Sequence, residues 1–490
     1  MTLDSTEPGA IAPRRMAVAL TPGDGGVVVT AVVTCLGVWS GEPAVAVIGA
    51  VVGLVVACSA RALLIGVAIA VLVPTAVLRS NQAWAALAPD ELGPHRGWVR
   101  LVDDPQPYAS STRVIVEADG QRFELWSRGR AQQLRVRRWR GGEWVYTSGE
   151  RVPLDAQRAH RVAWQHVVGE YRLDWVGDSD PGGPVARASN RVRAAIERAA
   201  EVLPDDDGAL YRGLVVGDDR DQPPAMIARF RASGLSHLTA VSGQNVAFVL
   251  AACGPFLRRL RPVARWVVSV ALIGWFMALT RFEPSIVRAG AMAALSASAY
   301  LTGRERSPLR LLALAVTGLV LVDPLLLWSV GFWLSVGATG GVVTVGPWLA
   351  GHLAWSGGLA LPLGITLGAQ VGVVVPSVLV FGRLPLVSVP ANLLAVPIAG
   401  AVMLYGLPAG LLAGAVPQVA PIVMLPVRFG TRWVDSVAML GAALEPPGAW
   451  PWVGWALLAF AASVGGSIAF VRGRRTGKNR SPHGDASADR

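Results

Sequence analysis

The chain has 490 residues, of which 52% are hydrophobic and only 16% are charged, and its mean hydropathy is +0.45. A soluble protein of this length needs more charge to cover its surface, so the composition excludes an ordinary soluble domain and predicts that much of the chain faces lipid. The formal net charge of +11 suits anionic lipid and nucleic acid alike, and it does not distinguish between them.

The N-terminal quarter of the chain changes from polar to apolar. Residues 1–26 are polar and rich in Pro and Gly, and they predict a flexible cytoplasmic lead. Residues 27–78 predict three short membrane helices, because their apolar runs contain almost no charge and approach the roughly 20 residues needed to cross hydrocarbon. We expect no cleavable signal peptide, because Pro22 and Asp24 interrupt the first apolar stretch.

Residues 79–185 differ from the rest because apolar and polar side chains alternate. The alternating segments are 98–102, 113–117, 122–126, 134–137, 143–146 and 150–154. Period-two segments separated by Asp-Gly and Gly-Gly turns are typical of antiparallel strands, and five or six of them fit a small closed β barrel of the OB type. Residues 186–207 predict a linker helix that leads back to the membrane.

The rest of the chain is hydrophobic again. Residues 208–471 predict a transmembrane channel domain of about nine further spans, for a total near twelve, followed by a basic cytoplasmic tail at 472–490. Arginines mark the cytoplasmic side of a membrane protein, and they cluster at 258–265, 304–306 and 472–480. The expected fold is therefore a polytopic α-helical membrane protein with a β domain inserted on the outer side. Residues 417–444 carry Arg and Asp at helical spacing, so they predict either a span or an interfacial helix.

A basic and aromatic segment within the β domain is the best candidate for contact with nucleic acid. Cations that follow phosphates, together with aromatic rings on which bases stack, suit sequence-tolerant binding of a single strand. The candidate residues are Arg128, Arg130, Arg135, Arg137, Arg138, Trp126 and Trp139. Residues 79–207 hold 19 arginines and 19 acids, so an ordinary solvated face remains the alternative.

A polar cluster precedes the apolar run 246–257. Polar groups at membrane depth occur in a protein interior or in a wet cavity, and Gly234 and Gly243 allow tight turns, so the segment predicts a re-entrant stretch that lines a pore. The alternative is a hydrogen-bonded helix start. The candidate path residues are His237, Ser242, Gly243, Gln244, Asn245, Arg288 and Asn392. Arg288 either meets a phosphate or pairs with Glu283 or Asp323, and interhelical hydrogen bonding is the alternative for Asn392.

Four sequence blocks in order carry a resemblance to a known family. They are Gly234-Leu235-Ser236-His237-Leu238 with Ala240, Ser242 and Gly243; Pro284 with Arg288-Ala289 and Met292; Asp323-Pro324 with Gly331-Phe332-Trp333-Leu334-Ser335; and Asn392-Leu393 with Pro397. This pattern resembles the ComEC-type competence proteins, in a short form without the C-terminal metallo-β-lactamase-like domain. Gln244-Asn245 departs from the pair that many members carry there.

The resemblance implies an inner-membrane channel that carries single-stranded DNA into the cytoplasm during natural transformation, with no enzymatic step, cofactor or metal. The implied partners are single-stranded DNA, membrane lipids, an extracytoplasmic DNA receptor, a cytoplasmic helicase, single-strand-binding proteins and a separate nuclease. Two alternatives remain: a transporter or flippase for another anionic polymer or lipid, and an intramembrane serine hydrolase built on Ser242 with His352 as base. No nuclease activity is expected, because the six histidines form no His-x-His-x-Asp-His run.

Overall fold

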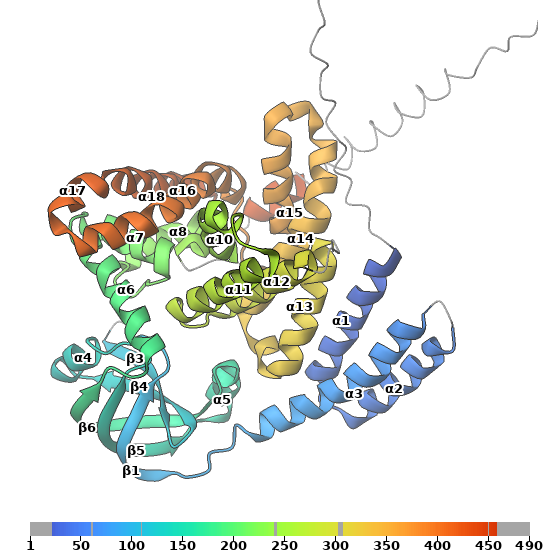
Figure 1. Cartoon of the computed structure of the whole chain (residues 1–490), viewed down its shortest axis with the longest axis horizontal. Coiled ribbons are helices and arrows are strands. Elements are labelled where there is room, and N and C mark those ends of the chain that lie inside the picture. Colours follow the sequence, from blue (N-terminus) through green and yellow to red (C-terminus); the bar gives the residue numbers. More distant parts are fainter. Residues whose placement is uncertain are drawn as a thin grey trace, which may run out of the picture.

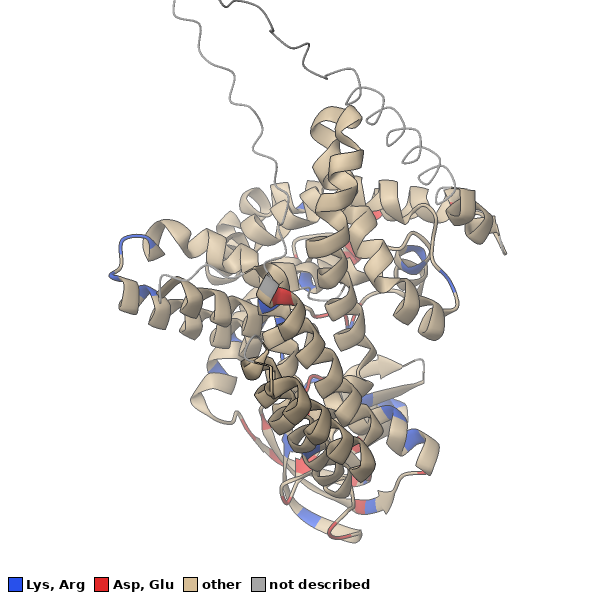
Figure 2. Ribbon diagram, turned by 90° about the vertical axis from the view of Figure 1, so that its right-hand side faces the viewer, with Lys and Arg blue, Asp and Glu red and all other residues tan. Residues whose placement is uncertain are grey.

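The computed structural model describes residues 22–59, 62–108, 110–239, 243–301, 307–448 and 450–457. A β domain lies at one end of a large helical body (Figure 1). Charged residues gather in the β domain and near helix ends, whereas most helical ribbons carry few of them (Figure 2). The two compositions seen in the sequence therefore correspond to two structural regions.

Three helices occupy the region before the β domain, namely α1 (Pro22–Ser40), α2 (Pro43–Ala57) and α3 (Leu63–Ala85). Helices α2 and α3 pack with their backbones in close contact, because Gly53 and Gly66 face each other's helix; a Cβ at Gly66 would lie 2.2 Å from Ala57 N. Small residues at a helix crossing are the usual device for tight packing in lipid.

The β domain contains six strands in one mixed sheet. The strands are β1 (Gly93–Leu101), β2 (Gln106–Tyr108), β3 (Ser111–Ala118), β4 (Gln121–Arg128), β5 (Trp144–Pro153) and β6 (Val167–Asp180). Their order is β1-β5-β6-β4-β3-β2, and β1 also pairs with β3 through Arg100 and Leu101. Only β4 and β6 run parallel. Val99, Phe123, Leu125 and Tyr171 form the centre of the domain's apolar core.

Three details of the expected strand pattern are wrong. The strand predicted at 134–137 is part of helix α4 (Arg130–Val136), which follows Gly129 at a φ of 84° and is built from the strong helix formers Arg, Ala, Gln and Leu. The two strands predicted at 143–146 and 150–154 are one strand, β5. The sequence interpretation also missed β6, which Gly149 allows to approach β5 closely.

The remaining elements are helical. They are α5 (Ala156–Val162), η1 (Ala163–Gln165), α6 (Pro184–Ala200), α7 (Asp205–Val216), α8 (Pro224–Ala232), α9 (Ser236–Thr239), α10 (Gly243–Leu257), α11 (Pro262–Leu279), α12 (Pro284–Leu301), α13 (Pro308–Val322), η2 (Pro324–Trp328), α14 (Val330–His352), η3 (Ala354–Leu359), α15 (Ala360–Phe381), α16 (Ser388–Ala415), η4 (Pro417–Val419), α17 (Ala420–Val423) and α18 (Leu425–Leu444).

Six helices in the described part of the chain are long and apolar enough to cross a membrane: α1, α3, α11, α14, the η3–α15 stretch and α16. Helices α2, α10 and α13 are apolar but shorter. The total near twelve stays a prediction, and residues 458–471 of the expected channel domain lie outside the described residues. The chain is thus a multi-pass membrane protein by helix length and composition.

Two further features complete the helical body. Helices α14 and α15 form a hairpin that projects from it on the side opposite the β domain (Figure 1). Helix α18, in the region whose placement the sequence left open, carries Arg432 and Asp435. These residues form ion pairs with Asp207 of α7 and Arg229 of α8, at 3.1 and 2.6 Å.

Candidate functional site

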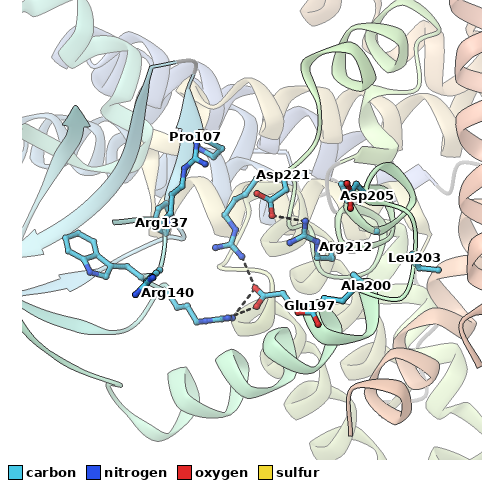
Figure 3. Close-up of a pocket in the computed structure, with 16 residues that line it drawn as sticks. Pro107, Arg137, Arg140, Glu197, Ala200, Leu203, Asp205, Arg212 and Asp221 are labelled. Carbon is cyan, nitrogen blue, oxygen red and sulfur yellow. Dashed lines mark hydrogen bonds and ion pairs between the residues drawn. The ribbon is translucent and has the colours of Figure 1, made fainter. Parts of the chain in front are cut away.

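A cleft of about 620 Å³ lies between the β domain and helices α6 and α7 (Figure 3). Five arginines and four carboxylates line it, namely Arg137, Arg138, Arg140, Arg212, Arg220, Glu197, Glu201, Asp205 and Asp221. The segment that follows α4 supplies the first three arginines, and the helical body supplies the rest of the charges. The cleft therefore lies at the interface between the β domain and the helical body.

Most of the cleft arginines are already paired. Glu197 accepts hydrogen bonds from Arg140 at 3.1 Å and from Arg220 at 3.0 Å, and Arg212 forms an ion pair with Asp221 at 2.8 Å. Arg137 and Arg138 are exposed, and within the described ranges neither has a carboxylate within ion-pair distance. These two are the cleft cations that remain available to a ligand.

A buried ionic network holds the β domain to the helices beside the cleft. Asp104, which follows β1, forms ion pairs with Arg193 of α6 at 2.9 Å and with Arg281 after α11 at 2.8 Å. Asp104 also accepts a hydrogen bond from Gly141 N. Burial alone would raise the pKa of Asp104, but the guanidinium groups of Arg193 and Arg281 outweigh it and hold that pKa well below its ordinary value. Sequence reasoning missed this network, because its members are far apart in the chain.

Three other carboxylates near this junction have raised rather than lowered pKa values. Burial raises the pKa of Asp103 to about 6, and burial together with the charges of Asp219 and Asp103 raises the pKa of Glu283 to about 7. The pKa of Asp219 is raised by burial and by Asp218. Asp219 and Glu283 are nevertheless exposed to solvent over part of their surface.

The predicted pore-lining segment spans α9 and the start of α10. His237 and Gln244 are exposed, whereas Asn245 is buried and donates a hydrogen bond to Leu214 O at 3.1 Å. Gly243 lies against α12, where a Cβ would be 2.8 Å from Ala289 Cβ and 3.0 Å from Nη2 of Arg288. Ser242 lies outside the described residues.

Arg288 is a buried cation at the start of α12. Its side chain is next to Gly243, and the residue is only 5% exposed. Nε donates to Ser335 Oγ at 2.9 Å, and Nη1 donates to Met292 Sδ at 3.0 Å. The expected alternative partners do not reach it: Asp323 instead bonds Nε2 of His166 at 3.0 Å, and across the described ranges neither Glu283 nor another carboxylate pairs with Arg288.

Asn392 belongs to a different environment. It is buried and donates to Ser388 O, one turn earlier in α16, at 2.7 Å. The Ser388 hydroxyl accepts a hydrogen bond from Gln370 of α15 at 2.9 Å. The amide of Asn392 therefore bonds within α16, and the hydrogen bond that joins α15 to α16 is made by Gln370 rather than by Asn392.

The candidate DNA-contact residues of the β domain divide into two groups. Arg128, Arg130, Arg135, Arg137 and Arg138 are all exposed, but only the last two line the cleft. The two tryptophans require correction. Trp139 lines the cleft but is only 6% exposed, with most of its ring packed in the domain core. Half-buried Trp126 is covered by Tyr108 and Arg158, each at 5.4 Å.

The described residues contain no group of three or more His, Cys, Asp or Glu side chains arranged to hold a metal ion. His352, the base required by a hydrolase, lies at the end of α14 with Nδ1 2.8 Å from Trp348 O. That contact occupies one ring nitrogen, and within the described residues the ring of His352 contacts Trp348 rather than the start of α10.

Comparisons with known proteins give a consistent result. The family model described as "Competence protein" matches residues 214–475, more than half of the chain. The chain is 27% identical to "Competence protein ComA" of Neisseria gonorrhoeae over 59% of its own length and 46% of that protein. It is 26% identical to "ComE operon protein 3" of Bacillus subtilis, over 51% of this chain and 32% of the relative. The chain thus spans less than half of these relatives, and no solved structure matches it.

Proposed function

The chain belongs to the competence protein family, and from this premise we propose that it forms the membrane path by which single-stranded DNA enters the cell during natural transformation. The family relates the chain to DNA uptake in competence. The channel itself, its substrate strand and its partners are our proposal, and they rest on the arrangement of charged and polar residues described above.

Arg288 is the observation that carries the proposal. A buried guanidinium without a carboxylate partner is costly in a membrane protein, and such groups usually line a substrate pathway. Arg288 adjoins Gly243, at the start of the helix that follows the segment containing exposed His237. A DNA phosphate that passed this point would supply the missing anion. Since a single such cation lies at this point among the described residues, the contact would be weak enough for the strand to move on.

The β domain would receive the strand on the outer side of the membrane. Its strand pairings support an OB-like closed barrel, because β1 pairs with both β5 and β3, and β4 and β6 are parallel. Arg137 and Arg138 would contact phosphates at the cleft. An extracytoplasmic receptor would deliver DNA there, and a cytoplasmic helicase and single-strand-binding proteins would draw it inward. The chain would perform no covalent step, which leaves breakdown of the other strand to a separate nuclease.

Uptake of labelled DNA tests the proposal. The recipient is a naturally competent bacterium from which its own competence channel gene has been deleted, and the donor DNA carries a label on both strands. Expression of this chain should restore nuclease-protected label in one strand only. Label that stays outside the cell, despite membrane insertion of the chain at normal abundance, would refute the channel.

A further inference from the structure

A row of aromatic side chains covers the outer face of the β domain. Trp98, Trp144 and Trp175 are 44%, 37% and 50% exposed, and Tyr146 is half-buried between them; together they form the aromatic face. They come from three neighbouring strands, β1, β5 and β6. None of them lines the cleft that contains Arg137 and Arg138. The aromatic face is therefore a second surface, separate from the one assigned to DNA.

The register of the strands builds this face. Trp98 of β1 is opposite Tyr146 of β5, and Trp175 of β6 is opposite Ser148 of β5. Their inward neighbours Val99 and Val145 are buried, so strand alternation directs the aromatic rings outward. The ring of Tyr146 meets those of Trp98 and Trp175 edge to face, with centroids 5.5 and 6.5 Å apart.

Local structure holds the rings in place. Gly177 leaves room for the Trp175 ring, because a Cβ at this glycine would lie 2.5 Å from that ring. Trp98, Trp144 and Asp180 enclose a shallow hollow of about 410 Å³ at one end of the row. Large aromatic residues that could pack in a core instead form a continuous exposed row, which is a common property of a binding surface.

The charges on the same strands limit the kind of ligand. Strands β1, β5 and β6 carry four arginines and five acids, namely Arg96, Arg100, Arg151, Arg172, Glu150, Glu170, Asp174, Asp178 and Asp180. Arg100 is already paired with Glu117 at 2.7 Å. Without a net positive charge the surface does not favour a polyanion such as DNA or an anionic lipid surface. Mixed acids and arginines do suit hydroxyl groups, which donate to carboxylates and accept from guanidinium groups.

We propose that the aromatic face binds an uncharged polysaccharide strand. Pyranose rings have an apolar C–H face that stacks on aromatic side chains and a polar edge that hydrogen-bonds to neighbouring charged groups. Trp98 and Trp175 lie on either side of Tyr146, each edge to face with it at 5.5 and 6.5 Å, so the two indole rings would stack on two separate sugar units of an extended chain. OB-type domains accommodate oligosaccharides as well as oligonucleotides. Such binding would tether the β domain to a glycan outside the membrane, and it does not depend on the passage of DNA.

Calorimetric titration of the full chain in nanodiscs with a β-1,4-linked N-acetylglucosamine hexamer tests the proposal. We expect measurable binding that weakens at least about tenfold in Trp98→Ala and Trp175→Ala, because each removes one stacking ring. Gly177→Ala should also weaken binding, since it displaces the Trp175 ring without removing it. The matched control is Trp355→Ala, an 82% exposed tryptophan on η3, which should bind like the parent.

Three outcomes would overturn this assignment. The parent protein could fail to bind the hexamer, or the variants of the aromatic face could bind as tightly as the parent. Alternatively, an oligothymidylate could bind and lose affinity in Trp98→Ala and Trp175→Ala, which would assign the face to single-stranded DNA. Because uptake of labelled DNA is a separate measurement, failure of the glycan proposal can be distinguished from failure of the channel proposal.

Discussion

Replacement of Arg288 by Met separates a transport role from a structural one. Met keeps the length of the side chain and removes its charge. A structural arginine stabilises the fold, so its removal lowers the free energy of unfolding. An arginine that is retained to bind a passing phosphate instead lowers the free energy of unfolding of the protein without substrate, so its removal should stabilise the fold and abolish function.

The contacts of Arg288 set the expected size of the effect. An arginine at the centre of a span costs about 2.5–3.5 kcal/mol, and Arg288 is nearer the end of its helix, as the fifth residue of α12. Its hydrogen bonds to Ser335 and to the Met292 sulfur return part of this cost, at roughly 0.5–1.5 kcal/mol for an ordinary bond. We therefore expect R288M to raise the free energy of unfolding by about 1–2 kcal/mol.

The assay combines DNA uptake in the complemented deletion strain with thermal unfolding of the purified chain in detergent. R288M should reduce uptake about tenfold or more, equivalent to one lost charge-assisted hydrogen bond, while the melting temperature stays equal or rises. Arg310→Met is the matched control, because Arg310 forms an ion pair with buried Asp24 at 2.8 Å and its loss should lower the melting temperature. If R288M destabilises the chain as R310M does, Arg288 is structural and the reasoning fails.

Four other variants or sets test the remaining parts of the site. Gly243→Val should abolish uptake, because its side chain would collide with Ala289 and Arg288, whereas Gly254→Val, with no atom within 4 Å, should transport normally. Cysteines introduced at His237 and Gln244 into a cysteine-free background should react with a water-soluble thiol reagent, and one at buried Asn245 should stay protected. Arg137→Glu with Arg138→Glu should weaken binding of an oligonucleotide and reduce the slope of log affinity against log salt concentration by about 0.7 per lost phosphate contact. Arg128→Glu with Arg130→Glu, which lie outside the cleft, should change binding little. The pKa values of Asp103 and Glu283 are raised to about 6 and about 7, so both groups stabilise the fold in their protonated form, and this stability is lost as the pH rises through those values. D103N with E283Q should therefore make the melting temperature less dependent on pH between 5 and 8, and an unchanged pH dependence would contradict the assignment.

The hydrophobic pattern of the sequence predicted those helices and strands well for which burial of apolar side chains was the main requirement. Long apolar runs indicated helices, and strand periodicity indicated β1, β3 and β4, because burial of one face enforces period two. Residues 134–137 misled the same rule. Leu134 and Val136 alternate with arginines as in a strand, but they belong to a short helix that starts after Gly129 and buries only Val136. Strand β6 was missed because its outer half carries Asp174, Asp178 and Asp180, which interrupt the apolar signal.

The tryptophans illustrate how far a residue type alone can be interpreted. Arginine-rich surroundings selected Trp126 and Trp139, yet the first is covered and the second is in the core. The alternation of side chains along a strand would have indicated Trp98 instead. Trp98 lies on the face opposite to Val99 and Leu101, which are both buried, so its ring must point outward. Parity could not identify the neighbours on β5 and β6, since the register between strands is a tertiary property.

Charge pairing distinguishes the two kinds of buried arginine in this chain. Arg193 and Arg281 share Asp104, and Arg193 also donates to the carbonyls of Val216 and Leu279, so their charge is compensated and their function is to join the β domain to the helices. Arg288 has a comparable burial but only a hydroxyl and a thioether as acceptors. No sequence pattern reveals this difference. Asp323, at the end of the next helix after Arg288, is a plausible partner by sequence, but in the structure it bonds His166, which lies 157 residues earlier. A buried ion pair can often be replaced by apolar residues without loss of stability, whereas the charge of Arg288 has no carboxylate partner among the described residues. Under the proposed function, the phosphate of a moving strand would supply that partner.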